Sequence, residues 1–71
     1  MEARRQRRIR QTKLQIASVR EALEHFIERE HLFRAHKLGQ YAEHCARRAA
    51  ECRAKLESLL ATLNAMMGTQ S

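Results

Sequence analysis

Apolar residues recur every three or four positions through the first half of the chain, which is the spacing of an amphipathic helix. Written as heptads abcdefg, this stripe places apolar residues at a and d: Ile9, Ile16, Val19, Leu23, Phe26 and Phe33. Thr12 and Glu30 are the polar residues of the same two rows. No proline or glycine interrupts the stretch. We therefore expect a first helix over residues 9–37.

The second half carries a more regular stripe with the same period. Its a and d positions are small or aliphatic: Ala42, Cys45, Ala49, Cys52, Leu56, Leu59, Leu63 and Met66. The pattern predicts a second helix over residues 40–67. Gly68 is expected to end it as a C-terminal cap, followed by a polar tail over 68–71.

The two stripes do not share one register. The step between them is five residues, whereas the insertions that a continuous coiled coil tolerates are three or four. Gly39 lies at this break, after the cations His36 and Lys37, and is expected to adopt the left-handed conformation that ends a helix. These features favour an all-α antiparallel hairpin with its turn near 36–40 over a single long helix.

The two halves also match each other when the turn is centred between residues 37 and 38. In that alignment each Phe faces an Ala, and aliphatic residues face aliphatic ones. The predicted core of the hairpin is Ile9, Ile16, Val19, Leu23, Phe26, Phe33, Ala42, Ala49, Cys52, Leu56, Leu59, Leu63 and Met66. Phe26→Ala is expected to be among the most damaging single changes, at about 3 kcal/mol.

Further apolar residues lie outside these two rows. Most of them fall at position e, which widens the apolar stripe to that of a helix in a bundle. The predicted partner interface is Ile27, Tyr41, Ala46, Leu60 and Met67. We expect the hairpin to complete a four-helix bundle, either as a homodimer or with a different helical protein.

Charge is concentrated at the N-terminus. The chain has 14 Lys and Arg residues, eight Asp and Glu residues and a formal charge of +6. Residues 1–13 alone carry +5, from the predicted electrostatic arm Arg4, Arg5, Arg7, Arg8, Arg10 and Lys13. We expect residues 1–8 to form a frayed arm ahead of a single domain over 9–67. Such an arm suits nucleic-acid phosphates, an acidic protein or an anionic membrane surface, or serves only to keep the chain soluble.

No pattern in the sequence predicts a catalytic residue, a cofactor or a small-molecule substrate. Cys45 and Cys52 are seven residues apart in one predicted helix, about 10 Å along its axis, which is too far for a disulfide. His44 and Cys45 point in different directions on that helix, so no metal site is expected. The expectations are no enzyme activity, no transmembrane segment and, from the free thiols, a cytoplasmic location.

Two family resemblances centre on the turn. The segment 38–43, Leu-Gly-Gln-Tyr-Ala-Glu, resembles the turn between the paired helices of a tetratricopeptide repeat. The chain length, the hairpin and the pair Gln40 and Tyr41 resemble the small co-chaperones of type III secretion needle proteins, which implies binding to a secretion component.

The hypothesis that the sequence favours is a protein–protein interaction module: a chaperone, adaptor or assembly subunit that docks helix on helix with itself or with a partner. The alternatives are a nucleic-acid-binding regulator, in which a dimeric bundle displays two basic arms, and the type III secretion co-chaperone.

Overall fold

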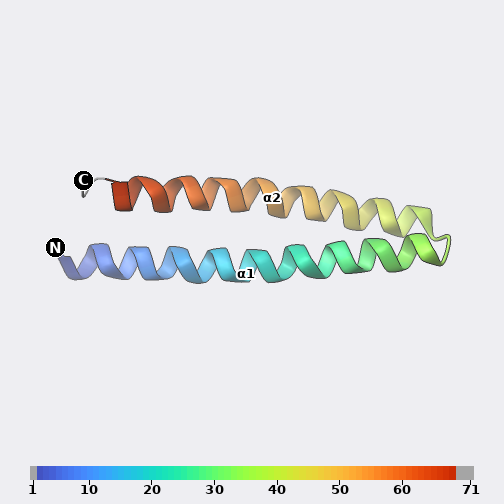
Figure 1. Cartoon of the computed structure of the whole chain (residues 1–71), viewed down its shortest axis with the longest axis horizontal. Helices are drawn as coiled ribbons and strands as arrows, with labels where there is room; N and C mark the ends of the chain where they lie inside the picture. The colour runs from blue at the N-terminus through green and yellow to red at the C-terminus, as the bar shows by residue number, and fades with distance from the viewer. Residues whose placement is uncertain (1, 69–71) are drawn as a thin grey trace.

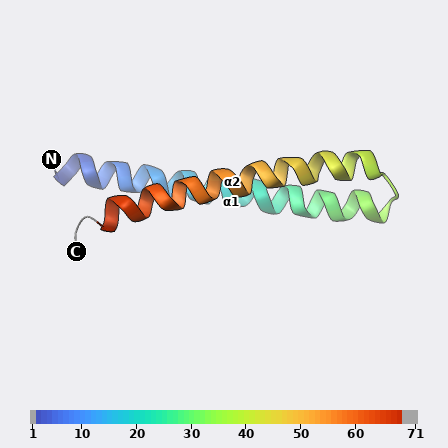
Figure 2. The same ribbon diagram turned by 90° about the horizontal axis from the view of Figure 1, so that it is seen from above.

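The fold is an antiparallel two-helix hairpin. The computed structural model describes residues 2–68, in which α1 spans Glu2–Ala35 and α2 spans Gly39–Gly68. The helices lie side by side, so the start of α1 and the end of α2 lie at the same end of a rod with extents of 53 × 15 × 14 Å (Figure 1). Seen from above, α2 crosses α1 at a shallow angle near the middle of the rod (Figure 2). The predicted all-α hairpin is confirmed.

The helix ends differ from those expected. α1 begins at Glu2, so residues 2–8, which we expected to precede the helix, belong to it, and it ends at Ala35 instead of residue 37. The early start has a physical basis, because no helix breaker occurs there and Arg5 donates a 2.7 Å hydrogen bond to the Met66 carbonyl of α2. Gly68 is the last residue of α2 instead of a cap beyond it, and positions 69–71 of the predicted tail lie outside the described residues.

The turn is a Schellman motif built on Lys37, not on Gly39. The amide of Leu38 donates to the Phe33 carbonyl at 2.8 Å, and the amide of Lys37 donates to the Arg34 carbonyl at 3.1 Å. Lys37 has a φ of 60°, and no glycine among residues 2–68 has a positive φ. The prediction of a left-handed Gly39 is therefore wrong: Gly39 is the first residue of α2. With Lys37 in the left-handed position, the next residue is the apolar Leu38, as this motif favours; a left-handed Gly39 would have put Gln40 there.

Moving the glycine should stabilise the hairpin. Lys37→Gly removes the steric cost of a side chain at positive φ, and Gly39→Ala adds a Cβ that meets no atom within 4 Å. We expect each change to raise the free energy of unfolding by about 0.5–1 kcal/mol, and the double variant by nearly the sum. Urea unfolding followed by circular dichroism measures both, and destabilisation by Lys37→Gly would contradict this turn geometry.

The core is a single seam between the two helices. Each a and d position from Arg5 to Phe33, and from Ala42 to Met66, is buried or half-buried. Five side chains among the described residues are buried: Thr12, Ile16, Ala42, Cys45 and Ala49. The Phe, Met and Leu residues of the seam are only half-buried, and no large side chain of the described residues is fully enclosed. Two helices therefore bring the seam together but do not cover it.

Polar members of the seam are satisfied locally. The Thr12 hydroxyl donates to the Arg8 carbonyl at 2.9 Å. Glu30, half-buried at an a position, pairs with Arg34 at 3.0 Å. These contacts let two polar residues lie at core positions without leaving a buried group unpaired.

Candidate interaction surfaces

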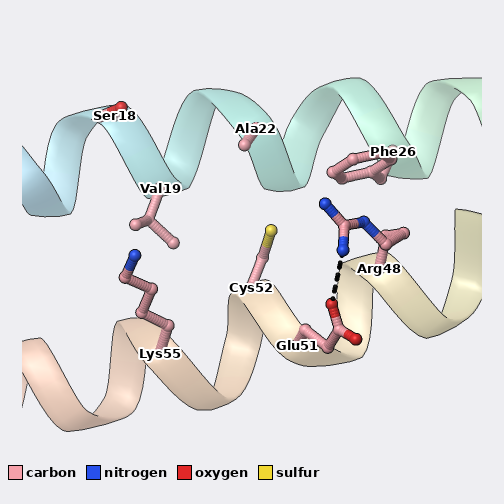
Figure 3. Close-up of a pocket in the computed structure, with 8 residues that line it drawn as sticks. All are labelled: Ser18, Val19, Ala22, Phe26, Arg48, Glu51, Cys52 and Lys55. Carbon is pink, nitrogen blue, oxygen red and sulfur yellow. Dashed lines mark hydrogen bonds and ion pairs between the residues drawn. The ribbon is translucent and has the colours of Figure 1, made fainter.

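The seam divides the hairpin into two long faces. In an antiparallel pair, the c and g positions of both helices lie on one side of the seam and the e and b positions on the other. We call these the c-g face and the e-b face. A groove confirms the division, because its walls come only from c, d and g positions: Ser18, Val19, Ala22, Phe26, Arg48, Glu51, Cys52 and Lys55 (Figure 3).

The groove on the c-g face has an apolar floor and charged edges. Its volume is about 340 Å³. The Arg48 guanidinium lies 5.7 Å from the centre of the Phe26 ring and pairs with Glu51 at 3.1 Å. Figure 3 shows the Lys55 ammonium reaching toward Val19 across the seam. Phe26, a residue of the predicted core, is half-buried in the seam, and its ring also lines this groove.

Charge on the c-g face has almost one sign. Its basic residues are Arg4, Arg8, Arg29, Arg48 and Lys55. Glu51 is its acidic residue, and Glu51 is already paired with Arg48. Gln11, Gln15 and Ser18 supply uncharged hydrogen-bonding groups on the same side of α1. The formal charge of the c-g face is therefore positive.

The e-b face is more apolar and carries mixed charge. Ile27, Ala46 and Leu60 are half-buried there, and Met67 is 47% exposed. The small residues Ala17 and Ala50 at b positions are exposed. Its charged residues have both signs: the basic ones are Arg10, Lys13, Arg20, Arg34 and Arg53, and the acidic ones are Glu24, Glu43 and Glu57. Four of the five predicted interface residues therefore lie on one face.

Tyr41, the fifth predicted interface residue, lies elsewhere. It occupies a g position, and its ring packs at a tilt against Phe33, with 5.5 Å between the ring centres. Tyr41, Leu32 and Leu38 are the exposed large apolar residues near the turn, with exposed fractions of 59%, 51% and 43%. Leu38 is not among the predicted interface residues; its position after the left-handed residue of a Schellman turn is the signal that could have found it.

The predicted electrostatic arm has two kinds of residue. Arg5 is half-buried at a d position and bonds the Met66 carbonyl, near the end of a helix whose last turn holds no basic residue. It therefore places a positive charge at the negative end of the α2 dipole and donates to a carbonyl in the last turn of that helix. The exposed members are Arg4, Arg7, Arg8, Arg10 and Lys13. These five, and not Arg5, are available to a partner.

Arg5 should matter for stability and Arg4 should not. We expect Arg5→Ala to lower the free energy of unfolding by about 1 kcal/mol, because it removes a charge-assisted hydrogen bond and a favourable dipole interaction. Arg4→Ala, an equal change in charge at an exposed neighbour, should change it by less than about 0.5 kcal/mol. Thermal or urea unfolding of the two variants separates them; equal losses would mean that Arg5 acts only through net charge.

The cysteines and histidines do not form a common site. Cys45 is buried, Cys52 is half-buried and both are free thiols. The His25 ring meets the edge of Phe26, with 5.7 Å between the ring centres. Within residues 2–68, no three His, Cys or acidic side chains gather where they could hold a metal ion. Over the same range, neither helix combines the length and the apolar character needed to span a bilayer.

Comparisons with known proteins give no further guide. The chain matches no protein-family model, no curated protein and no solved structure. The first family resemblance therefore rests on the residues around the turn alone, and the second on two of these residues together with the chain length and the hairpin shape.

Proposed function

We propose that this chain is a protein–protein interaction module that pairs with a second copy of itself through the e-b face, forming a four-helix bundle. The observation that carries the proposal is the exposed surface. The hairpin has an accessible area of 5878 Å². A compact monomer of its 8.3 kDa mass exposes about 4,600 Å². The chain thus leaves exposed roughly 1,300 Å² of surface that a compact protein of this size would normally bury.

The missing burial agrees with the size of a dimer interface. If dimer formation covered half of this excess area on each copy, the two copies together would bury about 1,300 Å². That total is within the range of stable, specific interfaces. The seam also lacks a second layer, since its large apolar side chains other than Ile16 are only half-buried. Packing another pair of helices against it is the usual way to cover such a seam.

The e-b face suits a second copy better than the c-g face does. Exposed Ala17 and Ala50 allow close approach of a facing helix, and Ile27, Leu60 and Met67 supply apolar contact. A two-fold interface uses the same patch on both copies, so it needs both signs of charge within one patch. The e-b face has both, whereas two c-g faces would repel each other. Repulsion between the basic ends also favours an antiparallel arrangement of the two hairpins.

A bundle of this kind acts by binding other proteins and needs no catalytic residue. The role that we propose is that of an adaptor or assembly subunit. The exposed apolar residues near each turn, Leu32, Leu38 and Tyr41, are then presented at both ends of the bundle.

Two exposed alanines of α2 allow a matched test. Ala50→Arg places a charge on the e-b face, and Ala65→Arg places the same charge at a c position; both native side chains are exposed, so the hairpin itself is left intact. Light scattering after size exclusion should give a monomer for Ala50→Arg and a dimer for Ala65→Arg. Loss of the dimer in Ala65→Arg alone would place the interface on the c-g face and refute this arrangement.

A further inference from the structure

The c-g face has two apolar places that the e-b face does not account for. One is the floor of the groove, where Val19, Phe26 and Cys52 are half-buried. The other is near the turn, where Leu32 and Tyr41 are exposed at c and g positions. Tyr41 and Cys52 are 11 residues apart on α2, or about 16.5 Å along its axis and about three helical turns. Both places are therefore within reach of one elongated partner that lies along the rod.

Cations lie beside these apolar places. Arg29 and Lys55 are exposed, and the described contacts give neither an ion pair. Arg48 lies over the Phe26 ring and pairs with Glu51, which is the one acidic residue at a c or g position. The e-b face, by contrast, has three acidic residues beside its five basic ones. The c-g face thus combines apolar contact with cations that can pair with the acidic groups of a partner.

We propose that the c-g face binds an amphipathic helix of a partner protein, whose apolar side chains enter the groove and pack on Tyr41 and whose acidic side chains pair with Arg29 and Lys55. The partner helix would lie along the seam as a third helix. The small side chains of Ser18 and Ala22 on the α1 edge of the groove allow its close approach. Figure 3 shows that the long charged side chains of the groove come from the α2 edge.

The shape of the groove favours a protruding apolar side chain over other anionic surfaces. Nucleic-acid phosphates would pair with the cations but leave the apolar floor and Tyr41 uncovered. The flat surface of a bilayer would not reach a floor that lies between two helices and below charged side chains. A second copy would repel this face, which has five basic residues and one acidic residue. A helix with an apolar stripe and acidic flanks matches both the floor and the cations.

The inference rests on the proposed role as an interaction module and names the kind of partner that the module binds. It does not depend on the dimer, because the c-g face is exposed in the single hairpin and is left uncovered when two e-b faces meet. Peptide binding and solution mass are separate measurements, so either proposal can fail alone.

The test uses three fluorescein-labelled synthetic peptides. The first has about three heptads with leucine at a and d and glutamate at e and g, where the like charges keep it from pairing with itself. The second has lysine in place of the glutamates, and the third has alanine in place of the leucines. By fluorescence anisotropy we expect the first peptide to bind at least about tenfold more tightly than either of the others.

Two pairs of variants test whether the peptide binds the c-g face. Lys55→Glu reverses a charge at the groove, and Arg47→Glu makes the same change in charge at an exposed f position of α2. We expect the first to weaken binding of the glutamate peptide about tenfold and the second by less than about threefold. Tyr41→Ala should weaken it about fivefold, whereas Leu14→Ala, at an exposed f position of α1, should leave it unchanged. Circular dichroism checks that all four remain helical.

Several results would overturn the proposal. Equal binding of the glutamate and lysine peptides is one, and equal weakening by Lys55→Glu and Arg47→Glu is another. A third is binding of a DNA duplex or of anionic vesicles without binding of the glutamate peptide, since the partner would then be a nucleic acid or a membrane surface. A dimer that does not bind the glutamate peptide would refute this inference alone, and a monomer that binds it would refute only the dimer.

Discussion

Replacing Ile16 by alanine should remove about 3 kcal/mol from the free energy of unfolding, the largest loss expected from shortening one side chain. Ile16 is 6% exposed and is the one large aliphatic residue among the buried side chains of residues 2–68. A domain of this length has a total stability of about 4–10 kcal/mol, so the change would consume a large part of it. Urea unfolding followed by circular dichroism, at one fixed protein concentration, measures the loss.

Phe26→Ala provides the contrast for this prediction. The sequence suggested that Phe26 would be among the most sensitive positions, because it faces Ala49 in the predicted seam. In the structure one side of its ring is open to the groove under Arg48, so part of its surface is never removed from water. We expect a loss of about 2 kcal/mol, smaller than that of Ile16→Ala. A larger loss at Phe26 would contradict an exposed groove on the c-g face.

Enlarging Ala49 should be almost as harmful as shortening Ile16. Ala49 is 1% exposed, so its side chain is enclosed between the two helices. A leucine there has no space, so it must push the helices apart or adopt a strained rotamer. We expect Ala49→Leu to lower the free energy of unfolding by about 2–3 kcal/mol. Unfolding experiments under the conditions used for Ile16→Ala report it.

Ala54→Leu is the matched control for Ala49→Leu. It makes the same substitution in the same helix, at an exposed f position, and leucine is a good helix former. Its effect on stability should lie within about 0.5 kcal/mol. If both substitutions were tolerated equally, the seam would not be close-packed at Ala49.

The helices and the seam could be predicted because the spacing of apolar residues can be read directly from the sequence. The rows that include Ile16 and Ala49 are the rows that the structure buries. The depth of burial could not be predicted in the same way. The spacing of apolar residues shows which side of the helix a residue faces. Its exposure depends on how much of it the opposite helix covers, and Phe26, which lines the groove beside the small Cys52, remains partly open.

The turn and the arm were less predictable, for two physical reasons. Glycine is the usual left-handed residue, but the hydrogen bonds of the Schellman turn put Lys37 in that position and so place the apolar Leu38 immediately after it. In the arm, net charge does not distinguish one arginine from another. Extending the heptads back by seven residues from Thr12 places Arg5 in the seam, and this signal separates it from the exposed arginines beside it.

The central claim is that a second copy covers the surface which one hairpin leaves exposed. The most direct test is the solution mass by light scattering after size exclusion, measured over a range of protein concentrations at low and at high salt. We predict a dimer of about twice the 8.3 kDa chain mass that persists at high salt, because apolar contact holds it together. A monomer at all concentrations would contradict the claim and would mean that the e-b face is not closed by this chain itself.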